Sequence, residues 1–328
     1  EIVADEVEQI NVEDMIKEED MVVMISRLGY IKRVSVEKYK KQDRGGKGSN
    51  SAALLEDDYI NQLFIGSTKD YLLFITNVGK AYWIKVHEIP ESERTSRGAH
   101  IKSLLAVGPD EEITAVVSLK EFAEDQYLFM TTANGVVKKV HTTEFSNAKT
   151  RGIIGLKLDT GDKLISAIQT TGSTEVMLIS RRGKALKIKE DSVRSMGRAS
   201  RGIKGMKLAE GDEIAAAVKV EEGTGLILVT EKGHGKRISS DLFSTHGRGT
   251  GGQRIFGNID GKGEIIGAVS ICDSDEIVCM TSQGKTLRIK ATEIKQQGAG
   301  ASGITIVKVS EPDYVVGIDK VQEKRDNE

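Results

Sequence analysis

The same unit of about fifty residues recurs six times along this 328-residue chain, and this periodicity constrains the fold more than any other feature. Each copy centres on a glycine between two short apolar runs, as in MISRLGYIKRV and LISRRGKALKI. The six anchor glycines are Gly29, Gly79, Gly135, Gly183, Gly233 and Gly284. A period of this length is typical of propeller blades, which bury their apolar faces by stacking against their neighbours.

The positions around each anchor glycine predict a β-hairpin. A hydroxyl side chain stands three residues before it in every copy: Ser26, Thr76, Thr132, Ser180, Thr230 and Thr281. That hydroxyl can hydrogen-bond the backbone of the turn, and the glycine can supply a positive φ.

Two apolar columns flank the predicted turn. The residues five before the anchor are Met24, Phe74, Met130, Leu178, Leu228 and Cys279. The residues five after it are all β-branched: Val34, Ile84, Val140, Ile188, Ile238 and Ile289. We predict that both columns are core.

A basic column precedes the second core column by one residue. Its members are Arg33, Trp83, Lys139, Lys187, Arg237 and Arg288. Neighbouring residues of a strand face opposite sides, so these cations are predicted to lie opposite the core. Charges that protect a sheet edge are the alternative, but edge protection does not require the same strand position in five copies. We predict that the column binds an anionic partner.

Each copy continues through a turn, a loop and another strand. Ten residues after the anchor, an apolar residue predicts a turn pinned to the core: Tyr39, Ile89, Phe145, Val193, Phe243 and Ile294. A loop follows in which Arg44-Gly45 is matched by Arg97-Gly98, Arg151-Gly152 and Arg201-Gly202, and more loosely by Gly251-Gly252 and Ser302-Gly303. The strands predicted between units span residues 62–66, 113–119, 164–170, 214–220, 265–271 and 314–321.

Three clear strands in each copy, with a short fourth near the loop, predict an all-β chain. Radial closure of six such sheets buries both faces of each and leaves only short, protected edges. We therefore predict a single six-bladed, propeller-like domain over residues 21–328. An open solenoid is the alternative, because periodicity alone does not require closure.

Charge is distributed unevenly along the chain. Residues 1–20 hold nine carboxylates and one lysine, and a mildly basic body follows. This acidic lead is interpreted as a linker, with competition for the basic surface as the alternative. Cys272 and Cys279 lie in apolar runs and are predicted to be reduced core residues. No apolar run is long enough to cross a membrane, so we expect a cytoplasmic protein with no membrane partner.

The sequence predicts no catalytic, cofactor or metal site. Its five histidines occupy non-equivalent positions: His87, His100, His141, His234 and His246. It contains no Walker loop or nucleophile elbow, and no Cys/His cluster with zinc-site spacing. The isolated chain is therefore predicted to be a binding module and not an enzyme.

The first copy carries a distinctive glycine-rich loop, QDRGGKG, at residues 42–48. Glycines allow positive φ and close approach of another backbone, and successive N–H groups in such a turn can form an anion-binding concavity. Arg44 and Lys47 add positive charge. A solvated turn has a similar composition, so the loop alone is a weak signal.

Together with the six repeats, this loop resembles the C-terminal domain of the A subunit of bacterial DNA gyrase. That family carries the box Gln-(Arg/Lys)-Arg-Gly-Gly-(Arg/Lys)-Gly in its first blade. The matching residues are Gln42, Arg44, Gly45, Gly46, Lys47 and Gly48. Asp43 departs from the pattern, because the family usually has a basic residue there.

The resemblance implies a β-pinwheel, a propeller relative whose blades exchange strands. It also implies non-specific binding of double-stranded DNA, which bends around the rim and enables ATP-dependent negative supercoiling by the holoenzyme. The implied protein partners are the gyrase B subunit, together with the N-terminal part of the gyrase A subunit.

Wrapping requires contacts from many blades. Bending 20–30 base pairs by 40–90° costs roughly 1–6 kcal/mol, so several such segments cost on the order of 10 kcal/mol. Phosphate contacts distributed over the disc would offset this cost without base specificity. Besides the box, the predicted DNA-binding residues are Arg33, Arg97, Lys139, Arg151, Lys187, Arg201, Arg237 and Arg288.

Two alternatives remain open. The C-terminal domain of the topoisomerase IV A subunit is similar, but its box is lost or eroded. A protein-binding propeller would need an apolar or aromatic rim, whereas Trp83 is the only tryptophan of this chain.

Replacing Arg44, Gly45, Gly46 and Lys47 with alanine is expected to leave the domain folded and able to bind DNA, because the other blades retain their phosphate contacts. In the reassembled enzyme, the variant should relax DNA but lose ATP-driven negative supercoiling, as measured by topology assays on circular DNA. Supercoiling at the normal rate would show that the box is only a turn.

Overall fold

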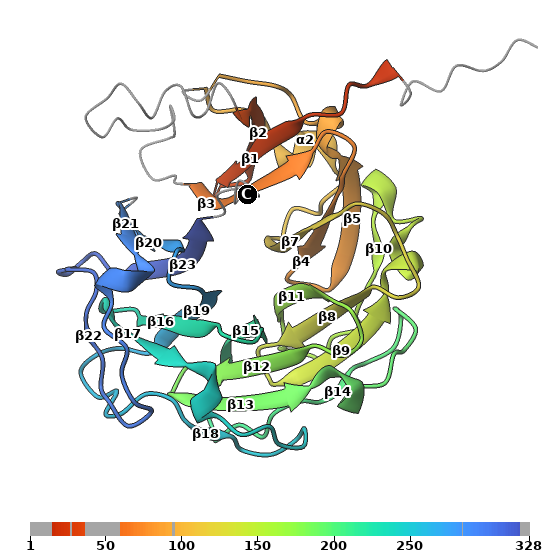
Figure 1. The fold of residues 1–328 in the computed structure, drawn as a ribbon. Helices are drawn as coiled ribbons and strands as arrows, with labels where there is room; N and C mark the ends of the chain where they lie inside the picture. The colour runs from red at the N-terminus through yellow and green to blue at the C-terminus, as the bar shows by residue number, and fades with distance from the viewer. Residues whose placement is uncertain (1–14, 27, 37–59, 94–95, 284, 322–328) are drawn as a thin grey trace, which may run out of the picture.

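A computed structural model of the chain describes residues 15–26, 28–36, 60–93, 96–283 and 285–321. Six β-sheets stand side by side around a central cavity (Figure 1). The box at residues 42–48, Tyr39 and residues 1–14 of the acidic lead lie outside the described residues.

The first three sheets contain four antiparallel strands each. The first holds β3 (Ile60–Ser67), β1 (Asp20–Ser26), β2 (Tyr30–Ser35) and β6 (Ala99–His100), in that order. The second holds β7 (Ile113–Leu119), β4 (Tyr71–Thr76), β5 (Lys80–Lys85) and β10 (Ile153–Ile154). The third holds β11 (Leu164–Thr170), β8 (Tyr127–Thr132), β9 (Val136–His141) and β14 (Ile203–Lys204).

The remaining sheets continue the pattern. The fourth holds β15 (Ile214–Val220), β12 (Glu175–Ser180), β13 (Lys184–Lys189) and β18 (Gln253–Arg254). The fifth holds β19 (Ile265–Ile271), β16 (Gly225–Thr230), β17 (His234–Ser239) and β22 (Ile304–Thr305). In the sixth, the described residues form β23 (Val315–Val321), β20 (Glu276–Thr281) and β21 (Thr286–Lys290).

Short helical turns follow the hairpins, as the sequence predicts. They are η2 (Val86–Glu88), η3 (Thr142–Phe145), η5 (Glu190–Ser192), η6 (Ser240–Leu242) and η7 (Ala291–Glu293). Two further turns, α2 (Ile101–Leu104) and η4 (Lys149–Arg151), belong to the second and third repeats. No helix in the described part of the chain is long and apolar enough to span a membrane.

The outermost strand of each four-stranded sheet comes from the following repeat. In the first sheet, His100 of the second repeat pairs with Tyr30. In the fourth, Arg254 of the fifth repeat pairs with Lys184. The structure therefore confirms the strand exchange that the family resemblance implies.

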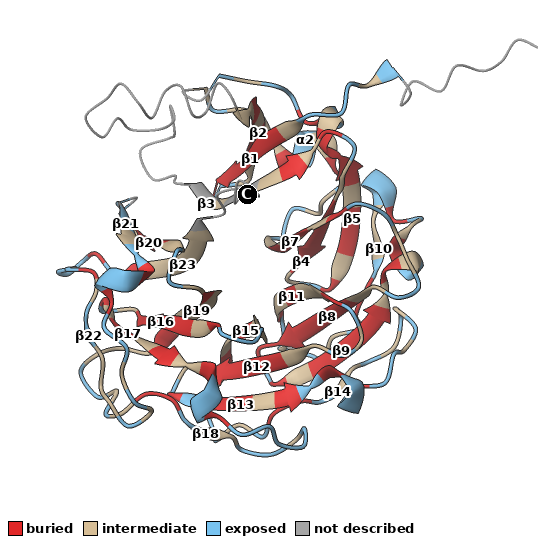
Figure 2. Ribbon diagram, in the orientation of Figure 1, coloured by how far each residue is buried: buried red, intermediate tan, exposed pale blue. Residues whose placement is uncertain are grey.

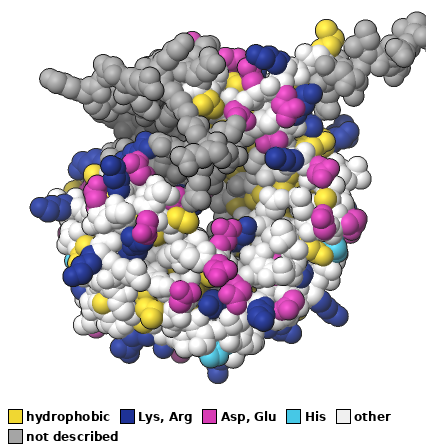
Figure 3. Space-filling model, in the orientation of Figure 1, with side chains coloured by type: hydrophobic (Ala, Val, Ile, Leu, Met, Phe, Trp, Pro, Cys, Tyr) yellow, Lys and Arg dark blue, Asp and Glu magenta, His cyan; other side chains and the backbone are white. Residues whose placement is uncertain are grey.

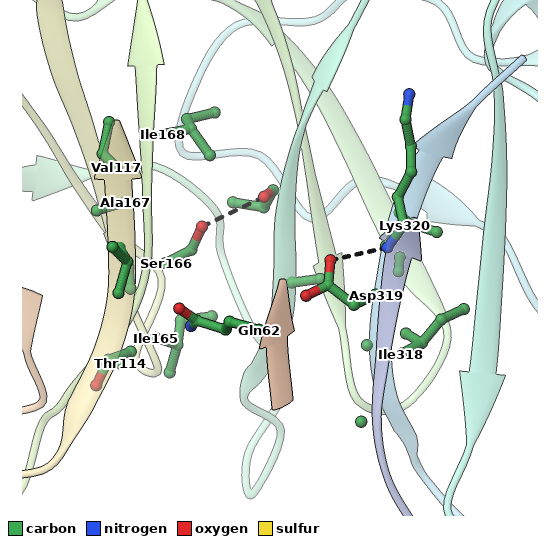
Figure 4. Close-up of a pocket in the computed structure, with 18 of the residues that line it drawn as sticks. Gln62, Thr114, Val117, Ile165, Ser166, Ala167, Ile168, Ile318, Asp319 and Lys320 are labelled. Atoms are coloured by element: carbon green, nitrogen blue, oxygen red, sulfur yellow. Dashed lines mark hydrogen bonds between the residues drawn. The ribbon is translucent and has the colours of Figure 1, made fainter. Parts of the chain in front are cut away.

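The central cavity shows that the blades form a ring. Its volume is about 690 Å³, and its lining includes Gln62 from β3 of the first repeat and Asp319 from β23 of the last (Figure 4). The six-bladed arrangement is confirmed, and the open solenoid is wrong.

The predicted hairpins are confirmed in all six repeats by the antiparallel pairing of their two strands. At five anchor glycines, φ lies between 78° and 86°. The hydroxyl three residues before the anchor glycine accepts a hydrogen bond from the N–H of the residue that follows the anchor, at 3.1–3.3 Å in every repeat.

In the second to sixth repeats both predicted core columns lie between blades, whereas Met24 and Val34 of the first repeat cluster with residues of their own repeat. The column five before the anchor is buried in every repeat, and the column five after it is buried except for Ile289, which is partly buried. One cluster, for example, joins Leu73 of the second repeat to Met130 and Val140 of the third. The second to fifth sheets thus bury both faces against their neighbours, and the exposed residues gather mainly in the outer loops (Figure 2). Cys279 is buried, as predicted, whereas Cys272 is half-buried.

Close contact between repeats requires glycine where each exchanged strand begins. Gly252 precedes β18 and has a φ of +70°, and a Cβ there would lie 2.5 Å from the Ala185 carbonyl oxygen. The missing side chain of this glycine therefore allows the backbone of the preceding repeat to pack directly against the loop.

Gly252→Ala is expected to lower the free energy of unfolding by about 2–5 kcal/mol, because left-handed backbone costs about 1–2 kcal/mol and overpacking about 1–3 kcal/mol. Gly247→Ala, five residues earlier, is the matched control, since its Cβ would meet nothing within 4 Å. Urea unfolding curves measure both variants, and equal stabilities would contradict the packing role of Gly252.

Candidate nucleic-acid interface

The candidate interface is a series of loops at the outer edge of the disc. We call them rim loops and number them by repeat: the described residues 92–93 and 96–98 for the second, and residues 146–152, 196–202, 246–252 and 297–303 for the third to sixth. Each rim loop lies between the helical turn of its own repeat and the short strand that the repeat adds to the preceding blade.

Main-chain hydrogen bonds tie the rim loops of the third to sixth repeats to the segment that follows the preceding repeat's rim loop and short strand. The N–H groups of Ala106, Lys157, Lys207 and Gly257 donate to the carbonyls of Thr150, Ser200, Thr250 and Ala301, respectively. The donor–acceptor distances are 2.9, 3.3, 2.9 and 2.9 Å. From the second repeat to the sixth, the rim loops and the segments that follow the short strands are therefore hydrogen-bonded in series along the edge of the disc, and we call this series the rail.

The spacing of the loop glycines corrects the alignment of the box. Gly98 follows the anchor Gly79 at the same distance as Gly48 follows Gly29. The pairs such as Arg97-Gly98 and Arg201-Gly202 therefore correspond to Lys47-Gly48, and their predicted match to Arg44-Gly45 is wrong. In this alignment, Arg44 corresponds to Arg198 and Arg248.

Exposed cations gather on the rim loops and on the short strands after them. Arg97, Arg151 and Arg201 are exposed, as the sequence prediction requires. Arg201 also lies 3.0 Å from Asp159, with 64% of its own side chain exposed. The structure adds exposed cations that the sequence analysis missed: Lys149, Lys157, Lys204, Lys207, Arg248, Arg254 and Lys308.

A fixed offset identifies several of these missed residues. Lys204 and Arg254 stand two residues after a loop glycine, and Lys157, Lys207 and Lys308 stand five after it. The fourth rim loop and its strand are rich in charge, whereas residues 297–303 of the sixth rim loop carry none. Figure 3 shows Lys and Arg side chains around much of the outer edge, with acidic side chains near the middle of the same face.

Four of the five cations in the basic column are largely buried, although a column that binds an anionic partner is expected to face solvent. Only 8–16% of the side chains of Arg33, Lys139, Lys187 and Arg237 is exposed, whereas 44% of Arg288 is. The physical reason is that in the first to fifth sheets the face that carries the column packs against the next blade, so a position opposite one core is in the next interface. A phosphate contact for these five residues stays a prediction.

Five members of this column donate a hydrogen bond to a main-chain carbonyl of the next repeat, and we call these five side chains latches. Arg33 Nε donates to the Ile89 carbonyl at 2.6 Å, and Lys187 Nζ donates to the Ser240 carbonyl at 3.4 Å. Lys139 and Arg237 reach the carbonyls of Glu190 and Ala291 in the same way. Trp83 makes the equivalent contact, from Nε1 to the Ser146 carbonyl at 3.1 Å. The shared function of the column is therefore donation to the next repeat's helical turn.

Carboxylates accompany the latches. Glu91 lies 3.7 Å from Arg33, Glu190 lies 4.0 Å from Lys139, and Glu175 lies 3.8 Å from Lys187. Arg237 pairs with Asp273, and Arg288 pairs with Glu276. These pairs offset the column's charge within the protein.

The central cavity is a weaker candidate site. Burial raises the pKa of Asp319 to about 6, and its carboxylate accepts the Lys320 N–H (Figure 4). The Lys320 ammonium pairs with Asp275 at 2.9 Å, and Lys219 pairs with Glu221 at 3.1 Å. Among the described residues, no three His, Cys, Asp or Glu side chains are grouped to hold a metal.

An apolar docking surface has little support in the exposed residues. The exposed large apolar side chains of the repeats are spread over five of the six repeats: Leu28, Val78, Ile154, Leu242, Leu287, Ile304 and Tyr314. Trp83 is half-buried and stacks edge-on against Tyr71, with ring centroids 5.0 Å apart. The rim loops therefore offer charge, and the aromatic side chains serve packing.

Comparison with known proteins gives a consistent family assignment. The sequence matches the family described as "DNA gyrase C-terminal domain, beta-propeller" at residues 20–67, 70–120, 126–171, 174–221, 226–272 and 275–322. It is 61% identical over 322 residues to the DNA gyrase A protein of Treponema pallidum, covering 98% of this chain and 40% of that protein. Identity to the gyrase A protein of Salmonella typhimurium is 40%, covering 97% and 36%. The chain thus spans about two fifths of the length of these relatives.

Solved structures share the whole architecture. A DNA gyrase A C-terminal domain superposes with a TM-score of 0.77 at 33% identity, covering 92% of this chain and 99% of that one. The C-terminal domain of a DNA topoisomerase IV superposes with a TM-score of 0.79 at 27% identity, covering 94% and 95%.

Lys187→Met is expected to lower the free energy of unfolding by about 1–3 kcal/mol, because it leaves the Ser240 carbonyl and Glu175 without their cation. Lys189→Met is the control, since Lys189 lies on the same strand and is exposed. Surface changes of this kind usually stay within about 0.5 kcal/mol. Equal unfolding midpoints in urea would show that the latch does not stabilise the blade interface.

Proposed function

The chain belongs to the DNA gyrase C-terminal domain family, and from that premise we propose that it binds the phosphate backbone of double-stranded DNA along its rim loops and bends the duplex around the disc. The observation that carries the proposal is the hydrogen-bonded rail of rim loops with outward cations on successive blades.

The chemistry of the rail suits phosphates more than bases. Arg and Lys side chains on loops can neutralise successive phosphates of a duplex that follows the edge, and each neutralised phosphate releases counterions. The disc edge is curved, so DNA that engages several blades must bend. The bending energy, on the order of 10 kcal/mol for several segments, is offset only when contacts come from many blades. Such contacts give little sequence specificity.

Within the larger protein, this domain would wrap DNA and leave the chemistry to other parts. The chain spans about two fifths of its gyrase A relatives, so the remainder of such a protein, with the gyrase B protein beside it, is the proposed site of cleavage and ATP use. Wrapping of the DNA around the disc would then bias strand passage toward negative supercoils.

A topoisomerase IV domain is the second candidate, because the fold of one superposes as well as that of a gyrase domain. The sequence favours gyrase, with 61% identity to a gyrase A protein and six of seven box positions present. Supercoiling of relaxed circles by an enzyme assembled with this domain distinguishes the two, since relaxation alone would favour the second candidate.

The triple variant Arg201→Gln, Lys204→Gln and Lys207→Gln is expected to weaken DNA binding by at least about tenfold at 0.1 M salt. The slope of log affinity against log salt should become shallower by about 2–3, because each lost phosphate contact removes about 0.9. Fluorescence anisotropy with labelled duplexes of unrelated sequence measures both quantities.

The control variant carries Lys120→Gln, Lys163→Gln and Lys232→Gln, three exposed lysines outside the rim loops. Both variants change the net charge equally, so the control should keep its affinity within about twofold. Equal losses in the two variants would show that net charge alone governs binding and would sink the rim-loop interface.

A further inference from the structure

Three lysines are buried beneath the rim loops and bind main-chain carbonyls. They occupy the position three residues after the anchor glycine, where the six repeats have Lys32, Tyr82, Lys138, Leu186, Lys236 and Leu287. Lys32, Lys138 and Lys236 are at most 1% exposed. The column was not singled out by its sequence, because cations alternate there with apolar residues.

The ammonium groups bind the backbone of the following repeat's rim loop. Lys138 Nζ donates to the carbonyls of Arg198 and Ser200 in the fourth rim loop, at 2.5 and 2.8 Å, and to Gly155 at 3.0 Å. Lys236 Nζ donates to three carbonyls of the sixth rim loop: Gly298 at 2.8 Å, Ala299 at 2.9 Å and Ala301 at 3.0 Å. Lys32 Nζ donates to the Ser96 carbonyl of the second rim loop at 2.6 Å.

Apolar packing alone does not call for lysine at these positions. A buried ammonium costs several kcal/mol unless hydrogen bonds compensate it. Leu186 and Tyr82 fill the equivalent positions in other repeats and are fully buried. What lysine adds is three donors that match three carbonyls. These carbonyls direct the negative ends of their peptide dipoles inward, away from an anion approaching the rim.

We propose that Lys138 is a positioning residue that holds the fourth rim loop in the conformation that presents its outward cations to DNA phosphates, whereas Lys236 holds a sixth rim loop that carries no cation. The inference rests on the proposed DNA-binding function and assigns Lys138 an indirect part in it, since its side chain does not reach the surface. In the third rim loop, Gly152 instead packs directly against the Tyr82 ring.

The chain contains its own control for this inference. The fourth rim loop carries Arg198 and Arg201, whereas residues 297–303 of the sixth carry no cation. Lys138→Met and Lys236→Met each remove one buried ammonium and three hydrogen bonds. Their effects on folding should therefore be similar, while their effects on DNA binding should differ.

The experiment measures DNA affinity by anisotropy and thermal unfolding for both variants of the full chain. Lys138→Met is expected to weaken binding by about five- to tenfold, and Lys236→Met by less than about twofold, with comparable decreases in Tm. Equal losses of affinity would overturn the inference. If Lys138→Met does not fold, Lys138→Leu replaces it, because leucine is the residue of the fourth repeat.

A double-mutant cycle tests the coupling directly. Arg201→Gln should weaken binding in the unsubstituted chain and have little further effect in Lys138→Met, because the loop that aims Arg201 is already displaced. Arg254→Gln, on the strand after the fifth rim loop, should weaken binding equally in both backgrounds. Additive effects of Lys138→Met and Arg201→Gln would overturn the positioning role.

A pH profile gives an independent readout. Burial lowers the pKa of Lys138 to about 8, with Glu144 opposing that shift and Arg198 adding to it. Loss of the proton leaves two donors for three carbonyls. The affinity of the unsubstituted chain should therefore fall more between pH 7 and pH 9 than that of Lys138→Met, and identical profiles would contradict the clamp.

Failure of the inference differs from failure of the proposed function. If the triple variant at Arg201, Lys204 and Lys207 binds DNA normally, the rim-loop interface is wrong and the positioning role falls with it. If that variant binds weakly while Lys138→Met and Arg201→Gln are additive, the interface stands and only the positioning role is wrong.

Discussion

The pairing of each repeat's short outer strand with the preceding blade is the interaction on which the rest of this structure depends. The two-residue strand β18, for example, pairs its Arg254 with Lys184 and so completes a sheet that would otherwise end in an open edge. To make them, the chain must leave its own blade, cross to the neighbour and return. The rim loops are the turning points of that path, so the same exchange that joins the blades also places the loops at the outer edge.

Burial of both sheet faces divides the cations of the chain into two groups. Cations of the basic column meet the next blade and become latches, as Arg33 and Lys187 do by donating to carbonyls. Cations on the rim loops and after them stay exposed, as Arg201 and Lys207 do. Only the second group is available to an anionic partner without disturbing the packing between blades. The capacity for phosphate contacts therefore follows the loops and not the strand column.

Much of the fold could be read from the repeats because their constraints are local. A positive φ at the anchor glycine and a hydroxyl bond three residues earlier depend on a few neighbouring residues, and they recur in each copy. The apolar columns five residues before and five residues after the anchor identify the strands and their core positions. The strand exchange and the family came from the box and the repeats together, through resemblance and not through periodicity.

The sequence by itself determined the repeat count, the hairpins, the core columns and the family. Tertiary structure decided which cations face outward, because that depends on what packs against the second face of each strand. It also revealed the buried lysines. From the sequence alone, Lys138 would be taken for an exposed charge, but the fourth rim loop, sixty residues away, places the carbonyls of Arg198 and Ser200 within hydrogen-bond distance of its ammonium group. A contact over that separation leaves no local pattern, since carbonyl groups of any residue can accept the bonds.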